Sequence, residues 1–406
     1  MPVTEIERIN LKGEGVSADG MTIPRTLPGE GIDVAEDGSV RIITPAPDRV
    51  APPCRHFRSC GGCAMQHASD PFVAAWKTQM IRTGLAARGI DTEIREIHTS
   101  PPHSRRRATL HGRRTKKGVL VGFHSRASET LIEVPDCQLL HPEIMTGMPA
   151  LKALTLFGAS RKGEISLAVT CSEAGLDIDI RDAKPLEPQQ LVELSVLAEK
   201  FNLARLCWDG EVIATRNPPI QTFGTAVVVP PPSAFLQATE HGQVTLQAAV
   251  AEVLGTARSV TDLFAGCGTF SLPAANTAEV WALEGDESLI HVLDQAWRKS
   301  TGLKKVNAEF RDLFRRPVLP QEFSGQDAVI IDPPRAGAQA QSIELAQSEV
   351  PMIAAVSCNP VTFARDAEIL IKGGYRLDWV QPVDQFRWST HVELAAQFTK
   401  AHIARN

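Results

Sequence analysis

A cysteine near the end of the chain stands where a thiol could act as a nucleophile. Cys358 follows an apolar run over 353–356 and precedes Asn359 and Pro360, which can begin a helix. The dipole of a helix N-terminus favours an anion, so this position predicts a thiol with a lowered pKa. The plain alternative is a buried cysteine with no chemical role. We favour Cys358 as a catalytic residue.

A carboxylate in the last predicted strand is the second candidate. Glu393 lies within an alternating apolar run formed by Val392, Leu394 and Ala396. Successive side chains of a strand point to opposite faces, so Glu393 faces away from these apolar residues. It is either a residue that faces a reaction site or an ordinary solvated strand residue.

A glycine-rich turn indicates a nucleotide-type cofactor site. The segment DLFAGCGT at 262–269 joins a predicted strand to a helix, and its glycines let the backbone approach a ligand closely. Glu284 ends the next predicted strand, near the spacing of ~20 residues at which an acid meets ribose hydroxyls. Asp312 and Asp332 end two further predicted strands. A dehydrogenase would carry a third glycine where this chain has Ser271.

Four cysteines have the spacing of metal ligands. Cys54, Cys60 and Cys63 lie within ten residues, with a Gly-Gly bend before Cys63, and Cys137 lies far downstream. Tetrahedral zinc and an iron–sulfur cluster both accept four cysteines, and a metal-free core is the third alternative. In a cytoplasmic chain these cysteines would not form disulfides.

A basic stretch lies between Glu96 and Glu129, an interval without acidic residues. A solvated face is the common explanation for a run of charge. In a chain of net charge −5, such segregation favours contacts with RNA phosphates. The stretch contains eight basic residues: Arg105, Arg106, Arg107, Arg113, Arg114, Lys116, Lys117 and Arg126.

The whole chain has the composition of a globular protein. Its 406 residues predict two or three domains at ~150 residues each. With 43% apolar and 22% charged residues, the composition excludes disorder, collagen and coiled coil. No apolar run approaches the ~18–20 residues that span a bilayer, and charges in the first 15 residues exclude a secretory signal. We expect a cytoplasmic protein without membrane contact.

The pattern of predicted elements divides the chain into three parts. Residues 1–50 carry short alternating runs broken by glycine and proline, which predicts a short β module. Residues 51–234 mix the cysteines with a helix over about 71–88 and β-like runs, which predicts a central α+β domain. In residues 235–406, strands alternate with helices. This predicts a doubly wound, mainly parallel α/β sheet whose ligand lies at the carboxyl ends of the strands.

These motifs together resemble the RNA uracil-5-methyltransferase family, whose members make 5-methyluridine in tRNA and large-subunit rRNA. The match rests on the glycine turn, DPPRAG at 332–337, SCNP at 357–360, HVE at 391–393 and FLQ at 235–237. The resemblance implies a seven-stranded methyltransferase sheet, with Cys358 as the nucleophile that adds to C6 of uracil and Glu393 as the base. It also implies S-adenosylmethionine as cofactor, bound by Gln237, Phe264, Thr269, Glu284, Asp312 and Asp332.

The cysteine segment C-x5-C-G-G-C-x-x-Q-H resembles the iron–sulfur subset of this family. It implies that Cys54, Cys60, Cys63 and Cys137 hold a [4Fe–4S] cluster with a structural role in an RNA-binding domain. The first 50 residues resemble a shortened RNA-binding barrel. The implied partner is structured RNA, with 23S rRNA favoured over tRNA, and we expect a monomer.

Two other functions are compatible with part of these motifs. Asp-Pro-Pro also occurs in amino-directed methyltransferases, which place an aromatic residue after the prolines to stack the base. Here Arg335 follows the prolines, and such enzymes need no cysteine. The second alternative is a non-catalytic iron–sulfur protein that binds RNA on an inactive methyltransferase fold. The presence of Cys358, Glu393 and the glycine turn counts against it.

Overall fold

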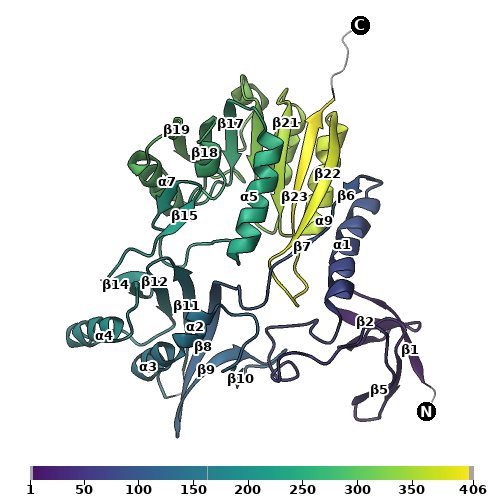
Figure 1. Cartoon of the computed structure of the whole chain (residues 1–406), viewed down its shortest axis with the longest axis vertical. Coiled ribbons are helices and arrows are strands. Elements are labelled where there is room, and N and C mark those ends of the chain that lie inside the picture. Colours follow the sequence, from purple (N-terminus) through teal and green to yellow (C-terminus); the bar gives the residue numbers. More distant parts are fainter. Residues whose placement is uncertain (1–2, 162, 402–406) are drawn as a thin grey trace.

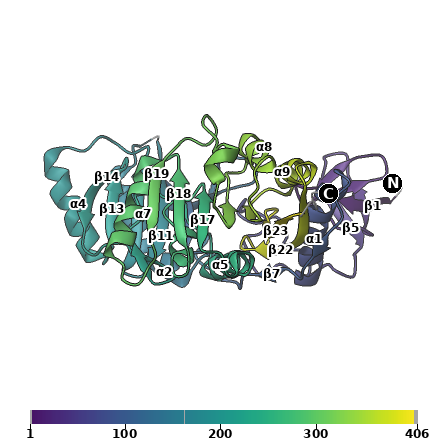
Figure 2. The same ribbon diagram turned by 90° about the horizontal axis from the view of Figure 1, so that it is seen from above.

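A computed structural model describes residues 3–161 and 163–401 of the chain. A large sheet flanked by helices occupies one part of the molecule, and a second sheet and a small N-terminal sheet lie below it (Figure 1). The molecule is elongated, with the N-terminal sheet at one end and α4 (Pro188–Lys200) at the other (Figure 2). No helix in the described residues combines the length and apolarity that a membrane span requires.

The large sheet has nine strands. Five of them run parallel, in the order β19-β18-β17-β20-β21, and β23 lies antiparallel between β21 and β22. Seven strands come from the C-terminal region: β17 (Ser259–Leu263), β18 (Glu279–Glu284), β19 (Val306–Phe310), β20 (Ala328–Ile331), β21 (Met352–Ser357), β22 (Tyr375–Asp384) and β23 (Glu393–Lys400). The predicted doubly wound, mainly parallel sheet is confirmed. The two further strands, which the sequence does not predict, pair with β22 at the edge: β6 (Glu93–Ile94) and β7 (His98–Thr99).

Helices cover both faces of this sheet (Figure 2). In β21, Ile353 and Ala355 pack on the side of α9, whereas Ala354 and Val356 pack on the side of α5. Burial on both faces explains why these strands read as continuous apolar runs. One face carries α1 (Asp70–Ala86), α8 (Gln339–Ala346) and α9 (Pro360–Lys372), and the other carries α5 (Glu240–Leu254) and α7 (Glu287–Lys299). Two short elements connect strands: α6 (Ser271–Ala274) and a 3-10 helix (Pro320–Phe323).

The position of α1 differs from the predicted domain boundaries. The helix itself is confirmed, and Ser69 caps it by accepting the N–H of Phe72 (3.2 Å). Its buried Ile81 and Leu85 belong to the same core as Phe363 of α9. The range 51–234 predicted for the central domain therefore includes α1, β6 and β7, which pack on the large sheet or pair with its edge. Apolar residues along one face of a helix predict that the helix packs on a sheet, but they do not show which sheet.

The second sheet has seven strands in the order β10-β9-β8-β11-β12-β13-β14, antiparallel except between β12 and β13. Leu110 and Val121 on its buried face pack in one core with Leu151 of α3 (Met148–Gly158), which gives the α+β arrangement predicted for this region. The strands are β8 (Arg107–Thr115), β9 (Gly118–His124), β10 (Leu131–Ile132), β11 (Glu164–Ser172), β12 (Gly175–Arg181), β13 (Arg205–Trp208) and β14 (Glu211–Thr215). They are accompanied by α2 (Pro142–Thr146), α3 (Met148–Gly158), α4 and the hairpin of β15 (Gln221–Phe223) and β16 (Ala226–Val228).

The N-terminal sheet has five antiparallel strands in the order β3-β2-β1-β4-β5. Ile6, Ile23 and Ile32 form its small core. This sheet confirms the predicted short β module. Its strands are β1 (Thr4–Ile9), β2 (Glu14–Ser17), β3 (Thr22–Pro24), β4 (Gly31–Val34) and β5 (Val40–Thr44).

Candidate active site

The glycine-rich turn follows β17, as predicted. Phe264, Gly266 and Gly268 have positive φ angles of 62°, 56° and 99°, so the backbone turns sharply here. A β carbon at Gly268 would lie 2.7 Å from Leu272, and only glycine tolerates both the angle and the space. A left-handed phenylalanine is strained, and such strain is concentrated at functional sites.

Glu284 holds this turn in place from the end of β18. Its carboxylate accepts hydrogen bonds from the N–H groups of Gly266 (2.8 Å) and Gly285 (2.7 Å). Asp312, which follows β19, lies beside them, since a β carbon at Gly285 would be 3.6 Å from the Cα of Asp312. The structure therefore brings the backbone of Asp312 beside Gly285, and the Asp312 carboxylate accepts the N–H of Phe314 (3.0 Å).

Two further acids lie under the turn. Asp262 belongs to β17 and Asp332 directly follows β20. Burial, together with the charge of Glu284, raises the pKa of Asp332 to about 7. Burial likewise raises the pKa of Asp262 to about 7. Ser271 donates a hydrogen bond to one oxygen of Asp262, but the other, Oδ1, is buried without a partner. A buried oxygen without a partner is uncommon, and here it can accept a further hydrogen bond.

The last two predicted cofactor residues flank this group. Thr269 ends the glycine turn, and its carbonyl accepts a hydrogen bond from the side chain of Gln247 (2.8 Å). Gln237 is buried, and its Oε1 accepts a hydrogen bond from Gln385 Nε2 (2.6 Å). Gln385 also forms a hydrogen bond that lowers the pKa of Glu393. Gln385 thus connects Gln237 with Glu393. The sequence does not identify Gln385 as part of the site.

Cys358 and Glu393 face one cavity. In the antiparallel pair of β21 and β23, Ser357 lies opposite Leu394, so the adjoining Cys358 and Glu393 are neighbours. Both line a cavity of about 460 Å³. Glu393 is only 3% exposed, which rules out a solvated strand residue. Cys358 precedes α9 as predicted, with Asn359 as the N-cap.

The predicted lowering of the Cys358 pKa is wrong. Burial raises the pKa of Cys358 to about 11, with further contributions from the charges of Glu393 and Asp332 that exceed the opposing effect of Arg335. The dipole of α9 therefore does not outweigh burial beside two carboxylates. Burial and the charge of Asp332 also raise the pKa of Glu393 to about 8. At neutral pH the free site holds a neutral thiol.

Aromatic and basic side chains surround this cavity. Phe235, Phe386, Arg105 and Arg335 all line it. The guanidinium of Arg105 lies 5.4 Å from the ring centre of Phe386, and Phe235 is 60% exposed. Aromatic rings stack on unpaired bases and guanidinium groups bind phosphate. The cavity therefore suits a nucleotide, although the sequence does not identify Phe386 as part of it.

The loop between β22 and β23 forms one wall of the cavity, and upstream residues hold it. Lys77 of α1 and Asp384 form an ion pair of 2.6 Å, with side chains 0% and 1% exposed. Lys77 also donates to the carbonyl of Phe386 (3.1 Å), and the N–H of Met65 donates to the carbonyl of Trp388 (3.0 Å). The sequence gives no sign of this role for Lys77, because its partner is 307 residues away.

The four predicted metal-ligating cysteines line a second cavity, of about 290 Å³. Their loop is anchored on β9, because the N–H of Gly61 donates to the carbonyl of His124 (2.9 Å). The buried Gln66 accepts the N–H of Cys54 (3.1 Å). The structure thus brings together four thiols from distant parts of the chain: Cys54, Cys60, Cys63 and Cys137.

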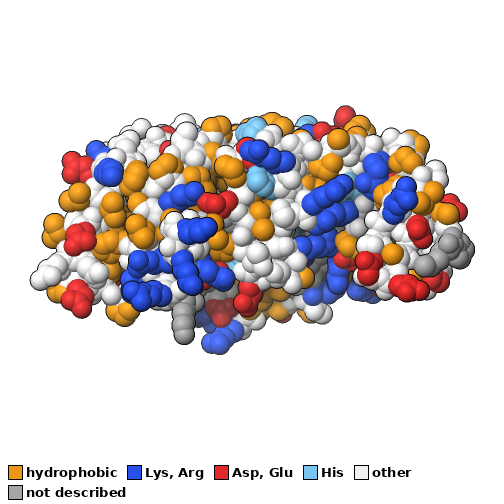
Figure 3. All heavy atoms as spheres, turned by 90° about the horizontal axis from the view of Figure 1, so that it is seen from below, with side chains coloured by type: hydrophobic (Ala, Val, Ile, Leu, Met, Phe, Trp, Pro, Cys, Tyr) orange, Lys and Arg blue, Asp and Glu red, His pale blue; other side chains and the backbone are white. Residues whose placement is uncertain are grey.

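Part of the basic stretch is used inside the protein. Arg106 donates to Gln243 (2.7 Å) and Arg107 to the carbonyl of Leu236 (2.6 Å). Other members pair with carboxylates, Arg113 with Glu164 and Arg126 with Glu14. The exposed members include the two lysines of the β8–β9 turn, at 116–117. Figure 3 shows Lys and Arg side chains gathered in two groups on the lower face of the molecule.

The chain is similar to known proteins along nearly its whole length. A family model described as tRNA (uracil-5-)-methyltransferase matches residues 300–401. A Brucella suis protein named as an uncharacterized RNA methyltransferase is 43% identical over 402 residues, which cover 97% of each chain. The 23S rRNA (uracil(1939)-C(5))-methyltransferase RlmD of Hahella chejuensis is 30% identical over 98% of this chain and 97% of its own length. The chain belongs to the RNA uracil-5-methyltransferase family.

The fold of this family member agrees with a solved structure. The Pyrococcus abyssi tRNA (uracil-54, C5)-methyltransferase in complex with S-adenosyl-L-homocysteine has a TM-score of 0.77, covering 98% of this chain and 99% of that chain at 21% identity. The enzyme class predicted from the sequence, an S-adenosylmethionine-dependent RNA (uracil-5-)-methyltransferase, is confirmed.

Proposed function

We propose that this enzyme methylates C5 of a uridine in structured RNA through a transient covalent bond between Cys358 and C6. One observation carries the proposal: Cys358 and Glu393 are neighbours in one cavity. This cavity lies at the same edge of the large sheet as the glycine turn. C5 of uracil is a weak nucleophile, so a group must first add to C6. A thiol beside a carboxylate supplies the nucleophile and the base for such a reaction.

Each bond change can be assigned to one of these residues. The Cys358 thiol releases its proton to solvent, and its sulfur adds to C6, which places the electron pair of the C5–C6 double bond on C5. C5 then takes the methyl group that S-adenosylmethionine would supply, with S-adenosylhomocysteine as the leaving group, and Glu393 removes the proton from C5 and passes it to solvent. The S–C6 bond breaks, the double bond re-forms and the Cys358 thiolate is regenerated. A carboxylate whose pKa is about 8 can accept and release a proton near neutral pH.

The residues around the glycine turn fit S-adenosylmethionine. When bound, this group would supply a transferable methyl group on a positively charged sulfonium. Glu284 and Asp312 are the carboxylates beside the turn, where ribose hydroxyls are commonly bound. Asp332 carries a pKa raised by burial, and such a carboxylate favours a cationic ligand. We assign cofactor binding to Gln237, Phe264, Thr269, Glu284, Asp312 and Asp332.

The rim of the cavity would hold the target nucleotide. A uracil within folded RNA must leave its stack to reach a buried thiol. Phe235 and Phe386 offer aromatic faces for the extruded base, and Arg105 and Arg335 offer guanidinium groups to its phosphates.

The four cysteines favour an iron–sulfur cluster over a single zinc ion. Around zinc, with Zn–S of about 2.3 Å, tetrahedral sulfur atoms lie about 3.8 Å apart. Among the described residues, the groups of three or more ligand atoms within 4.8 Å of one another do not include these sulfur atoms. Their wider spacing around a cavity of about 290 Å³ supports a cluster of several metal ions with a structural role.

Metal analysis of the enzyme purified without air tests this assignment. About four irons and about four acid-labile sulfides per chain are expected. Stoichiometric zinc without sulfide would contradict the cluster and favour a mononuclear site.

We assign 23S rRNA as the substrate. The relative named for 23S rRNA matches nearly the whole chain at 30% identity, whereas the likeness to the enzyme named for tRNA is one of fold, at 21% identity.

A methylation assay tests both substrate and chemistry. Purified enzyme is incubated separately with 23S rRNA and tRNA transcripts, and 5-methyluridine is mapped by mass spectrometry. We expect it in 23S rRNA only. Methylation of tRNA alone would overturn the choice of RNA, and a product other than 5-methyluridine would overturn the proposed chemistry.

A further inference from the structure

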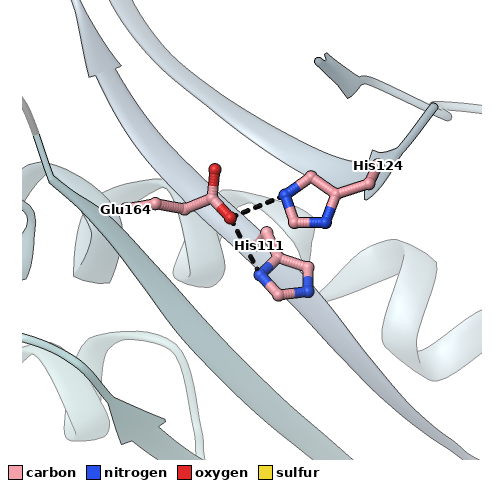
Figure 4. Close-up of side chains that lie close together, drawn as sticks. All are labelled: His111, His124 and Glu164. Atoms are coloured by element: carbon pink, nitrogen blue, oxygen red, sulfur yellow. Dashed lines mark hydrogen bonds and ion pairs between the residues drawn. The ribbon is translucent and has the colours of Figure 1, made fainter. Parts of the chain in front are cut away.

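Three ligand-type side chains meet on the second sheet (Figure 4), and none of the three is among the residues that line the two cavities. His111 lies on β8, His124 on β9 and Glu164 on β11. Both imidazoles point at the same carboxylate oxygen: Glu164 Oε1 is 3.0 Å from His111 Nδ1 and 2.7 Å from His124 Nε2. The two rings stack, with centroids 4.1 Å apart.

The strand register produces this meeting. Glu164 lies opposite Arg113, and His111 lies opposite Gly122. Side chains two residues apart on a strand share a face, so His111 and Arg113 point the same way as Glu164. His124 lies two residues beyond Gly122 and reaches His111 along the diagonal. The three side chains, one from each of the adjacent strands β9, β8 and β11, therefore lie close together.

The spacing is that of a metal-ligand set. Ligand atoms bound at about 2.1 Å are separated by about 3.0 Å at right angles and by about 3.4 Å at the tetrahedral angles that Zn²⁺ prefers. The two nitrogen–oxygen distances are 3.0 and 2.7 Å, and the three ligand atoms lie within 4.8 Å of one another. A metal ion could therefore be bound with little movement of the side chains.

Arg113 holds the carboxylate of Glu164 in place by a hydrogen bond. Its Nη2 donates to the other oxygen, Glu164 Oε2 (2.8 Å), which leaves Oε1 for the ion. Ligating carboxylates are commonly hydrogen-bonded in this way. The three ligand side chains are 20–34% exposed, so further coordination positions would be open to solvent.

We propose that His111, His124 and Glu164 bind one divalent transition-metal ion, such as Zn²⁺. Two imidazoles and one carboxylate suit Zn²⁺ and its first-row neighbours, whereas Mg²⁺ and Ca²⁺ prefer oxygen ligands throughout. The ion links β9, β8 and β11 on the face opposite their packed core. This site is distinct from the cavity lined by the four cysteines and does not depend on the proposed methyl transfer.

Titration with Zn²⁺ alone tests the site, on full-length protein purified without air so that the cysteine cavity keeps its contents. Isothermal calorimetry should show one more Zn²⁺ bound by the native protein than by His124→Ala, or affinity at least about tenfold weaker in that variant. Mg²⁺ should not compete. His291→Ala, an exposed histidine of α7, should bind as the native protein does. Equal stoichiometry and affinity in His124→Ala and the native protein would overturn the proposal.

Thermal unfolding gives a second measurement, because an ion that binds only the folded protein stabilises it. Zn²⁺ should raise the melting temperature of the native protein and of His291→Ala, but not that of Glu164→Gln, which keeps the side-chain size and loses the charge. A rise in Glu164→Gln equal to that of the native protein would contradict binding at these residues. Neither measurement uses methylation, so failure of the proposed function would not affect the result.

Discussion

Two cavities of this protein share a wall, and both contain thiols. Cys63 and Arg105 line the cavity of Cys358 as well as that of the four cysteines. Burial raises the pKa of Cys358 to about 11 and the pKa of Cys63 to about 12. Burial therefore does not distinguish a nucleophile from a metal ligand. The neighbours differ: Cys358 is beside Glu393 and Asp332, whereas Cys63 is beside other thiols.

The comparison shows that the surroundings of a thiol decide its chemistry. The Cys358 thiol lies beside a carboxylate in a cavity of about 460 Å³, so it can attack a base while its neighbour accepts a proton. Around the smaller cavity, burial and the charges of neighbouring thiolates raise the pKa values of Cys54, Cys60 and Cys63, so these thiols do not ionise together without a metal ion.

Replacing one thiol in each cavity should separate methyl transfer from iron binding, and this is the largest effect we expect. Cys358→Ala should lower methyl transfer at least about 10³-fold, because the group that activates C5 is removed. It should leave the iron content unchanged, whereas Cys60→Ser should lower it. Radiolabelled methyl transfer and iron analysis on the same samples measure both losses.

Cys207→Ala is the control for these variants. Cys207 is buried in β13, outside both cavities, so its removal should preserve methyl transfer and iron. Methyl transfer at the native rate by Cys358→Ala would show that the two cavities do not divide the chemistry as proposed.

Glu393→Gln should separate addition from elimination. Glutamine keeps the size of the side chain but is not a base, so turnover should fall about 10²–10⁴-fold. The Cys358–RNA bond should still form and should accumulate, which a denaturing gel during a single turnover can detect. Glu287→Gln, an exposed change in α7, is the control. Rapid turnover without accumulation would mean that another group removes the C5 proton.

Lys77→Met should destabilise the loop between β22 and β23, which forms one wall of the Cys358 cavity. It leaves Asp384 buried and unpaired, and loss of one partner of a buried ion pair costs about 3–5 kcal/mol of unfolding free energy. Urea denaturation measures this change. Addition of Asp384→Asn removes the stranded charge and should recover part of the loss. A cost below about 1 kcal/mol for Lys77→Met would show that this pair does not hold the loop.

Adduct formation should depend on pH in the direction set by the thiol. The thiolate is the reactive form and the pKa of Cys358 is about 11, so the rate should rise about tenfold per unit between about pH 6 and pH 9. Turnover should fall more steeply toward low pH, since protonation of Glu393, with a pKa of about 8, removes the base. Rapid-quench measurements give both profiles. An adduct rate that does not change with pH would contradict a neutral thiol in the free site.

Much of the large sheet and its site can be predicted from local sequence. Alternating strands and helices bring the strand ends to one edge, and this alone places Glu284, Asp332 and Cys358 near one another. The spacing of the first three cysteines predicts that they act together. Cys137 is distant in the sequence, and the fold brings it to the same cavity.

The remaining features depend on contacts between distant segments. Lys77 reads as an ordinary surface lysine of a helix, yet the packing of α1 on the large sheet buries it against Asp384. The pKa of Cys358 rises instead of falling, because β20 and β23 bring carboxylates that its own helix does not show. Arg106 reads as a phosphate contact, but it bonds to Gln243 inside the protein.

The central claim is the covalent bond between Cys358 and C6 of a uridine. Fluorine at C5 cannot be removed as a proton, so RNA containing 5-fluorouridine should trap the enzyme after methyl transfer. The account predicts a denaturation-resistant enzyme–RNA complex whose cross-linked peptide contains Cys358, and no complex with Cys358→Ala. An RNA that is methylated normally, yet yields no complex when it contains 5-fluorouridine, or a cross-link to another residue, would contradict the account.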